Sequence, residues 1–221
     1  MRRFLLLIPL LTLLSGCGNG RQTELNQNTG QLLPVSALAI DTHENGFVMT
    51  VETVRQDSLN GDAAPAYFTV EGETFDELFL RADELLASRL YLSHAQAILV
   101  SAPVAQYSLP ALVDSLLNRS DARLTLRIAV ARNAAPDRVL RADAVVEGIP
   151  GVALAALLDR RAADGSVADC PLFRLLDREI SGLPVSLPVL RLDGDGHAAP
   201  DGSARLADGE LSFTTGGTRH A

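Results

Sequence analysis

The residue best placed to undergo a chemical modification is Cys17, which ends an apolar N-terminal segment. Its context, Leu14-Ser15-Gly16-Cys17, resembles a lipobox, in which the thiol receives a diacylglycerol thioether and cleavage leaves the cysteine as residue one. A basic start at Arg2 and Arg3 and about eleven mostly apolar residues are typical of a secretory signal peptide. A spanning helix needs about 20 such residues, so this segment is too short. A plain signal peptide with a chance cysteine is the alternative.

The composition divides the chain into four parts. Residues 1–16 are the predicted signal peptide, and residues 17–31, rich in Gly, Asn, Gln and Thr, have the composition of a flexible tether. Residues 32–192 carry enough apolar side chains for one domain with a core. Residues 193–221 form a Gly-, Asp- and Ala-rich tail, in which residues 210–214 resemble a last strand.

The second thiol belongs to Cys170, at the start of an apolar stretch. A nucleophilic cysteine needs a histidine and an activating charge beside it, and the local sequence supplies no such set. We therefore interpret Cys170 as a small buried hydrophobe. If Cys17 is acylated, no disulfide can form within the chain.

A possible calcium loop begins at Asp193-Gly194-Asp195-Gly196-His197. A complete loop requires a bidentate Glu at its twelfth position, which is Ala204 here. The match fails, so a solvated Gly-rich loop without a metal is the prediction.

Other motifs of catalysis and cofactor binding are absent from the sequence. It contains no Gly-x-Ser-x-Gly, His-Glu-x-x-His, Gly-Lys phosphate loop or GxGxxG, and its four histidines are scattered. A formal net charge of −8 argues against binding to nucleic acid. We therefore expect no catalytic residues, no cofactor and no enzymatic activity.

Any site must be positioned by helices and strands, and the spacing of apolar residues predicts which of these the chain forms. It predicts an α+β domain, with helices on a mixed sheet that starts with a hairpin. The hairpin turn is Asn45-Gly46, and residues 55–66 read as a loop. Thr74 and Glu77 form a capping box at the start of the clearest helix. Side chains at helical spacing are predicted to face the core: Phe75, Leu78, Phe79, Ala82, Leu85, Leu86, Leu109, Leu112, Val113, Leu116 and Leu117.

An ordered set of segments resembles the Ger(x)C spore germination lipoproteins, and the similarity runs from Leu14 to about Leu190. Arg89-Leu90-Tyr91-Leu92-Ser93-His94 is similar to the family's Arg-Leu-Tyr-Phe-Gly-His segment. The other similar segments, besides the lipobox, are residues 35–41, 70–78, 119–125, 147–151 and 187–190. Two departures stand out: residues 18–25 replace the usual Trp-Asp-Arg-Arg-Glu-Ile, and the family's large C-terminal domain is not expected here.

The resemblance implies a non-catalytic subunit of a nutrient germinant receptor. It would lie on the outer face of the spore inner membrane, held by lipid on Cys17, with membrane-spanning receptor subunits as partners. Arg89, Tyr91 and His94 are first interpreted as structural residues of a turn, with His94 bonded to the backbone, and second as candidate partner contacts. An exported small-solute-binding lipoprotein remains the alternative.

Overall fold

The computed structural model describes residues 32–56, 63–86, 88–142 and 148–214. The predicted signal peptide, Cys17 and the tether therefore lie outside the described residues. The elements, in chain order, are β1 (Leu32–His43), β2 (Gly46–Gln56), β3 (Ala63–Gly72), α2 (Phe75–Leu86), β4 (Arg89–Tyr91), the 3-10 turn η2 (Leu92–His94), β5 (Ala97–Ser101), α3 (Ala102–Tyr107), α4 (Leu109–Leu117), β6 (Arg127–Arg132), α5 (Pro136–Leu140), α6 (Pro150–Ala163), α7 (Leu172–Ile180), β7 (Val185–Leu192), β8 (Ala198–Ala207) and β9 (Glu210–Thr214).

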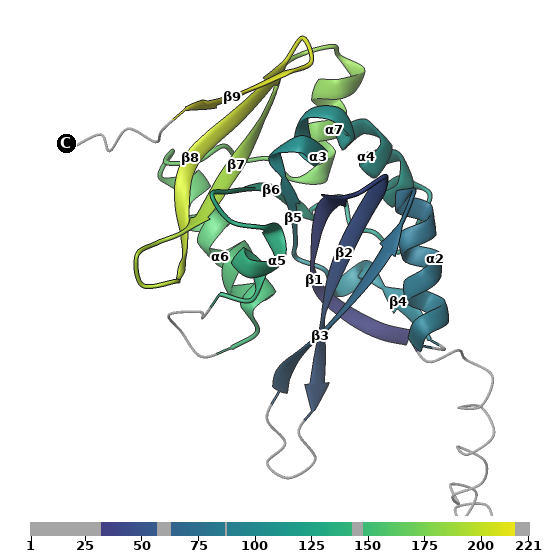
Figure 1. Ribbon diagram of the computed structural model, residues 1–221. Helices are drawn as coiled ribbons and strands as arrows, with labels where there is room; N and C mark the ends of the chain where they lie inside the picture. Colours follow the sequence, from purple (N-terminus) through teal and green to yellow (C-terminus); the bar gives the residue numbers. More distant parts are fainter. Residues whose placement is uncertain (1–31, 57–62, 87, 143–147, 215–221) are drawn as a thin grey trace, which may run out of the picture. The chain divides into compact units, whose positions relative to one another are not determined.

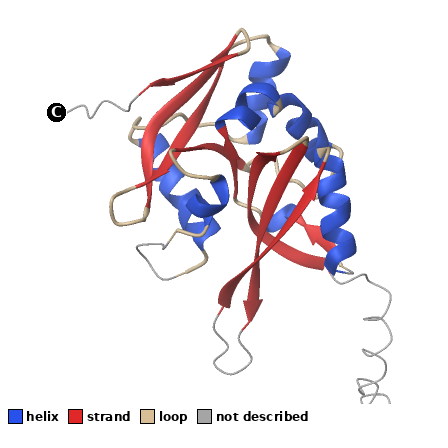
Figure 2. Ribbon diagram, viewed as in Figure 1, coloured by secondary structure: helices blue, strands red, loops and turns tan. Residues whose placement is uncertain are grey.

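The nine strands of the described residues belong to one mixed sheet, whose arrangement is shown in Figure 1 and Figure 2. Its order is β3-β2-β1-β5-β6-β7-β8-β9, and β4 pairs in parallel with the start of β1. The central strands β1, β5, β6 and β7 are parallel, whereas the hairpins at the two edges are antiparallel. The predicted α+β class, with its N-terminal hairpin, is confirmed.

Helices cover both faces of the central strands. Alternate β1 side chains divide between two cores: Leu38 and Ile40 face α2, α3, α4 and α7, while Ala37 and Ala39 face α5 and α6. A strand buried on both faces is expected to be almost continuously apolar, and residues 35–40 of β1 are all buried and apolar except for Ser36. Ala129 and Ala131 join the second core, and such small side chains allow a helix to approach the sheet closely.

Helix α2 begins with the predicted cap. Thr74 Oγ1 accepts a hydrogen bond from the Glu77 amide at 3.2 Å, and the Glu77 carboxylate accepts one from the Glu73 amide at 2.8 Å. Leu78 and Phe79 of α2 are buried as predicted. Leu85, in the last turn of the helix, is an error of the prediction, because it is 62% exposed.

The second predicted helix is confirmed as α4, with Leu112 and Leu116 fully buried. Ser108 occupies its N-cap position, but its side chain makes no capping hydrogen bond. Leu117 was wrongly predicted to face the core and is 45% exposed.

The β1–β2 turn differs by one residue from the prediction. Glu44 and Asn45 are its central residues, and Gly46 opens β2. A Cβ atom on Gly46 would collide with the carbonyl oxygen of Gly72 in β3, so this glycine is required by close backbone approach.

Two segments form more strand than the sequence suggested. β2 and β3 extend to Gln56 and from Ala63 into the predicted loop, and they pair as far as Gln56↔Ala63. The region after residue 192, assigned to a tail, also contains β8, which was not predicted and which pairs with β7. The strand predicted at residues 210–214 is confirmed as β9, which pairs with β8. β8 has few large apolar residues because its side chains pack only at alternate positions, such as the fully buried Ala204.

Candidate functional site

The segment Leu90–His94, which carries the family-like residues, runs beside the start of the sheet. Leu90 and Tyr91 of β4 pair with Leu33 and Pro34 of β1, and η2 follows immediately. Leu90 and Leu92 are fully buried. The backbone of the segment is therefore held by the core on one side and by β1 on the other.

Three charged residues from elsewhere in the chain fix this backbone. Asp83 of α2 accepts a hydrogen bond from the Leu90 amide at 2.7 Å, and Asp121 accepts one from the Leu92 amide at 2.8 Å. Arg119 donates to the Leu90 carbonyl at 2.8 Å. Hydrogen bonds of this kind, with one charged partner, are stronger than neutral ones.

Arg119 also lies close to the other two anchors, Asp83 and Asp121. Its Nε atom lies 3.4 Å from Asp121 Oδ1, and Nη1 lies 3.9 Å from Asp83 Oδ2. The guanidinium stacks over the Phe79 ring, 4.8 Å from its centroid. The sequence comparison included residues 119–125 but did not identify Arg119 or Asp121 as anchors, because their partners are remote in sequence.

The three predicted residues themselves point outward or lie at the surface. Arg89 and His94 are exposed, and Tyr91 is half-buried. The His94 ring meets the edge of the Tyr91 ring, with centroids 5.7 Å apart. Contrary to expectation, His94 makes no side-chain hydrogen bond to another described residue. The turn is anchored by Asp83, Arg119 and Asp121, which leaves the exposed side chains available for contacts.

A second polar cluster, missed by the sequence reasoning, surrounds the fully buried carboxylate of Glu52. Oε1 accepts hydrogen bonds from Ser36 Oγ at 2.6 Å and from the Gly151 amide at 2.8 Å, and Oε2 accepts one from the Tyr67 hydroxyl at 2.8 Å. Gly151 lies in the first turn of α6, where the helix dipole favours a negative charge. Because every donor is well placed, the cluster is interpreted as a structural connection between the sheet and α6.

Tyr67 supports that interpretation. Burial, followed by its hydrogen bond to Glu52, raises the pKa of Tyr67 well above its usual range. The phenol therefore remains a hydrogen-bond donor at physiological pH. The Arg141 guanidinium lies over the Tyr67 ring, 4.4 Å from the ring centroid.

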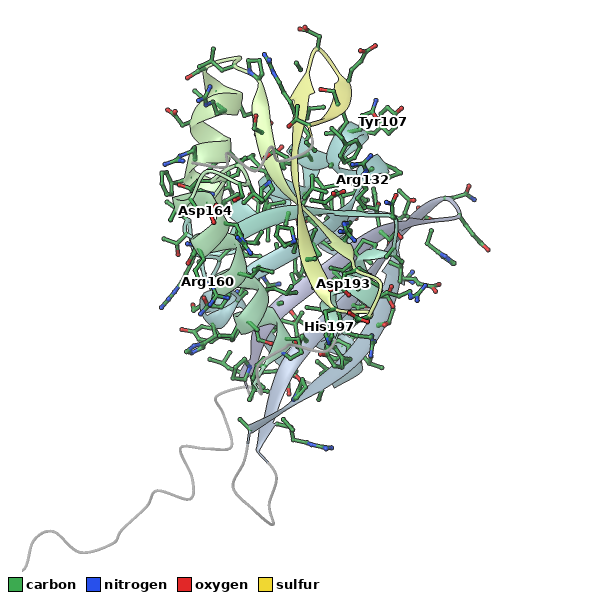
Figure 3. The ribbon with its side chains drawn as sticks, turned by 90° about the vertical axis from the view of Figure 1, so that its left-hand side faces the viewer. Tyr107, Arg132, Arg160, Asp164, Asp193 and His197 are labelled. Atoms are coloured by element: carbon green, nitrogen blue, oxygen red, sulfur yellow. The ribbon has the colours of Figure 1, made fainter. Side chains whose placement is uncertain are left out.

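The structure brings Asp193, Asp195 and His197 together at the β7–β8 turn (Figure 3), with candidate ligand atoms within 4.8 Å of one another. However, Asp193 Oδ1 already accepts hydrogen bonds from the backbone amides of Asp195 and His197, at 3.0 and 2.9 Å. This is the pattern of an Asp that stabilises its own turn. The absence of metal binding stays a prediction: calorimetry with calcium or zinc should show no saturable heat, and a micromolar site would contradict it.

Cys170 is 5% exposed and packs in the larger core. Burial, and secondarily the charge of Asp169, raises the pKa of its thiol to about 12. The thiol therefore stays protonated at neutral pH, which makes it a poor nucleophile.

The described residues thus define a class: an α+β domain whose polar clusters hold its backbone and whose exposed side chains can serve recognition. No helix in the described part of the chain is long and apolar enough to cross a membrane. The family described as spore germination protein N-terminal domain matches residues 27–192. The chain belongs to this family. No curated protein and no solved structure matches the chain significantly.

Proposed function

We propose that the protein is a lipid-anchored, non-catalytic subunit of a nutrient germinant receptor that acts in spore germination. The family match over residues 27–192 is the observation that carries the proposal. Outside the matched residues, the lipobox-like sequence at Cys17 supports attachment at the outer face of the spore inner membrane. The partners would be the membrane-spanning subunits of the receptor.

The position of the Leu90–His94 segment and of Arg89, which directly precedes it, supports a contact role for Arg89, Tyr91 and His94. β4 pairs with β1 at Leu32, where the described domain begins, only fifteen residues after position 17 in the chain. A segment of that length spans at most about 50 Å. A lipid on Cys17 would therefore keep this surface close to the membrane and raise its effective concentration toward membrane-spanning partners.

The lipid attachment has a direct test. Cys17→Ala removes the acceptor thiol, so we expect the protein to leave the membrane fraction and to accumulate as an uncut or miscut precursor of altered mobility. The physical reason is that one acyl chain holds a protein only marginally and two or more hold it stably, whereas this variant would carry none. Cys170→Ala is the matched control, and it should remain in the membrane fraction. Unchanged membrane association and mobility of Cys17→Ala would refute the lipid anchor.

The receptor role is tested by deletion in the source spore former and by recovery of the tagged protein from spore membranes. We expect the deletion to weaken germination in response to at least one nutrient, and membrane-spanning receptor subunits to co-purify with the wild-type protein. An intact response to every nutrient, together with no co-purifying subunit, would contradict the proposal.

The contact surface is tested in the same background. Arg89→Ala combined with His94→Ala should leave the melting temperature unchanged, because both side chains are exposed, but should reduce recovery of the membrane-spanning subunits. Arg160→Ala, an exposed arginine on α6, is the control and should recover them normally. Equal recovery by the double variant and the control would exclude this surface.

A further inference from the structure

An apolar pocket of about 230 Å³ opens where α4, α7, β7 and β8 meet. Its wall includes Leu109, Leu175 and Val185, all buried, together with Leu206 of β8. The β8–β9 turn and the connection from α7 to β7 lie at the same end of the domain (Figure 1). This pocket lies on different elements from the Leu90–His94 segment and from the Glu52 cluster.

Large apolar side chains are exposed in the lining segment 182–185 and just before it in the chain. Leu183, which lines the pocket, is 50% exposed, and Ile180, at the end of α7, is 85% exposed. Gly182 lines the pocket between them with a φ of 60°, a left-handed conformation that turns the chain from α7 toward β7. Exposed apolar groups gathered around a concavity are typical of a binding surface.

The rim is acidic. Glu179 and Asp208 line the pocket, and the charge of Asp114 acts on Glu179. Among the described residues, none of these three carboxylates forms an ion pair, although eleven ion pairs occur elsewhere. Partial burial, and secondarily Asp114, raises the pKa of Glu179. A cation placed here would relieve the repulsion between the carboxylates.

The volume indicates what kind of group fits. Small-molecule sites usually measure about 300–1,000 Å³, which is larger than the 230 Å³ pocket. An apolar cavity of about 150 Å³ already holds a benzene molecule. The pocket therefore suits one or two large apolar side chains rather than a whole metabolite.

We propose that this pocket docks a segment of a partner protein that presents a large apolar side chain with a Lys or Arg within about one helical turn of it. The apolar side chain fills the space between α4, α7 and β8, and the cation meets Glu179 and Asp208. The chain's own residues 215–221 do not fit, since they include no large apolar side chain. A second copy packed about a twofold axis through this pocket would bring the same carboxylates together, and its net charge is also negative.

The experiment uses the full chain, expressed in the source organism with a photoreactive amino acid in place of Leu183. A second strain carries it in place of Val152, which is similarly exposed, at 45%, but lies on α6. Membranes are irradiated, and the peptide joined to each adduct is sequenced by mass spectrometry. The expected result is a dominant adduct at position 183 whose partner peptide has a Lys or Arg within four residues of a large apolar residue.

Charge reversal then tests the rim. Glu179→Arg with Asp208→Arg should lower the yield of that adduct by about fivefold or more, because like charges across an interface are repulsive. The control is Glu84→Arg, at an exposed acid on α2, and it should leave the adduct yield unchanged. All variants should have the same melting temperature. The proposal is overturned if position 183 gives no more adduct than position 152, if the joined peptide comes from this chain or lacks the cation, or if charge reversal has no effect.

Discussion

Gly151→Ala should destabilise the domain by about 3 kcal/mol, although replacing glycine by alanine inside a helix usually stabilises it by about 1 kcal/mol. A Cβ at this position would lie 2.6 Å from Glu52 Oε1 and would also collide with Ala37 of β1. Neither neighbour can move freely, because Ala37 is fully buried within the sheet and Glu52 is held by three hydrogen bonds. The extra atom would push α6 away from the sheet and weaken the bond between the Gly151 amide and Glu52.

Chemical denaturation would measure the loss of unfolding free energy. In thermal unfolding, the melting temperature should fall by roughly 6–12 °C. Gly194→Ala is the matched control, because a Cβ there meets no atom within 4 Å, and it should change stability by less than about 0.5 kcal/mol. Equal stability of Gly151→Ala and wild type would mean that α6 does not pack on the Glu52 carboxylate as described.

The second large effect is expected for Phe79→Ala, which should cost about 3–5 kcal/mol. Phe79 is 3% exposed in the larger core, and its ring also supports the Arg119 guanidinium. The substitution removes apolar contacts, leaves a cavity and loosens an anchor of the Leu90–His94 segment. The melting temperature should fall by roughly 6–20 °C.

Two variants of the same helix separate these contributions. Leu80→Ala, at a position that is 58% exposed, should change stability by less than about 0.5 kcal/mol. Phe79→Leu retains much of the apolar volume and should cost less than Phe79→Ala. If Phe79→Ala has the same melting temperature as Leu80→Ala, the Phe79 ring does not contribute to the core.

Local periodicity predicted the parts of the fold that depend on neighbours in sequence. The spacing of apolar residues in α2 and α4 located the buried Leu78, Phe79, Leu112 and Leu116. Its errors lie at the helix ends, where Leu85 and Leu117 continue the apolar pattern but are exposed. Periodicity shows which face of a helix is apolar, but it contains no information about where the neighbouring layer stops.

Strand β8 shows the same limit. β8 has no continuous apolar pattern, and its Ala, Gly, Ser and Asp residues resemble a loop. It is a strand because β7 and β9 pair with it on both sides. Strand formation here depends on context more than on intrinsic preference.

The sequence by itself determined the α+β class, the main helices and the family-like segment around Arg89 and His94. Only the tertiary structure decided which residues hold that segment and where charge is buried. Glu52 and Gly151 are separated by 99 positions, and Leu92 and Asp121 by 29, so no local pattern could pair them. A buried carboxylate is tolerated only where its donors converge, and that convergence exists only after the sheet and its helices have packed.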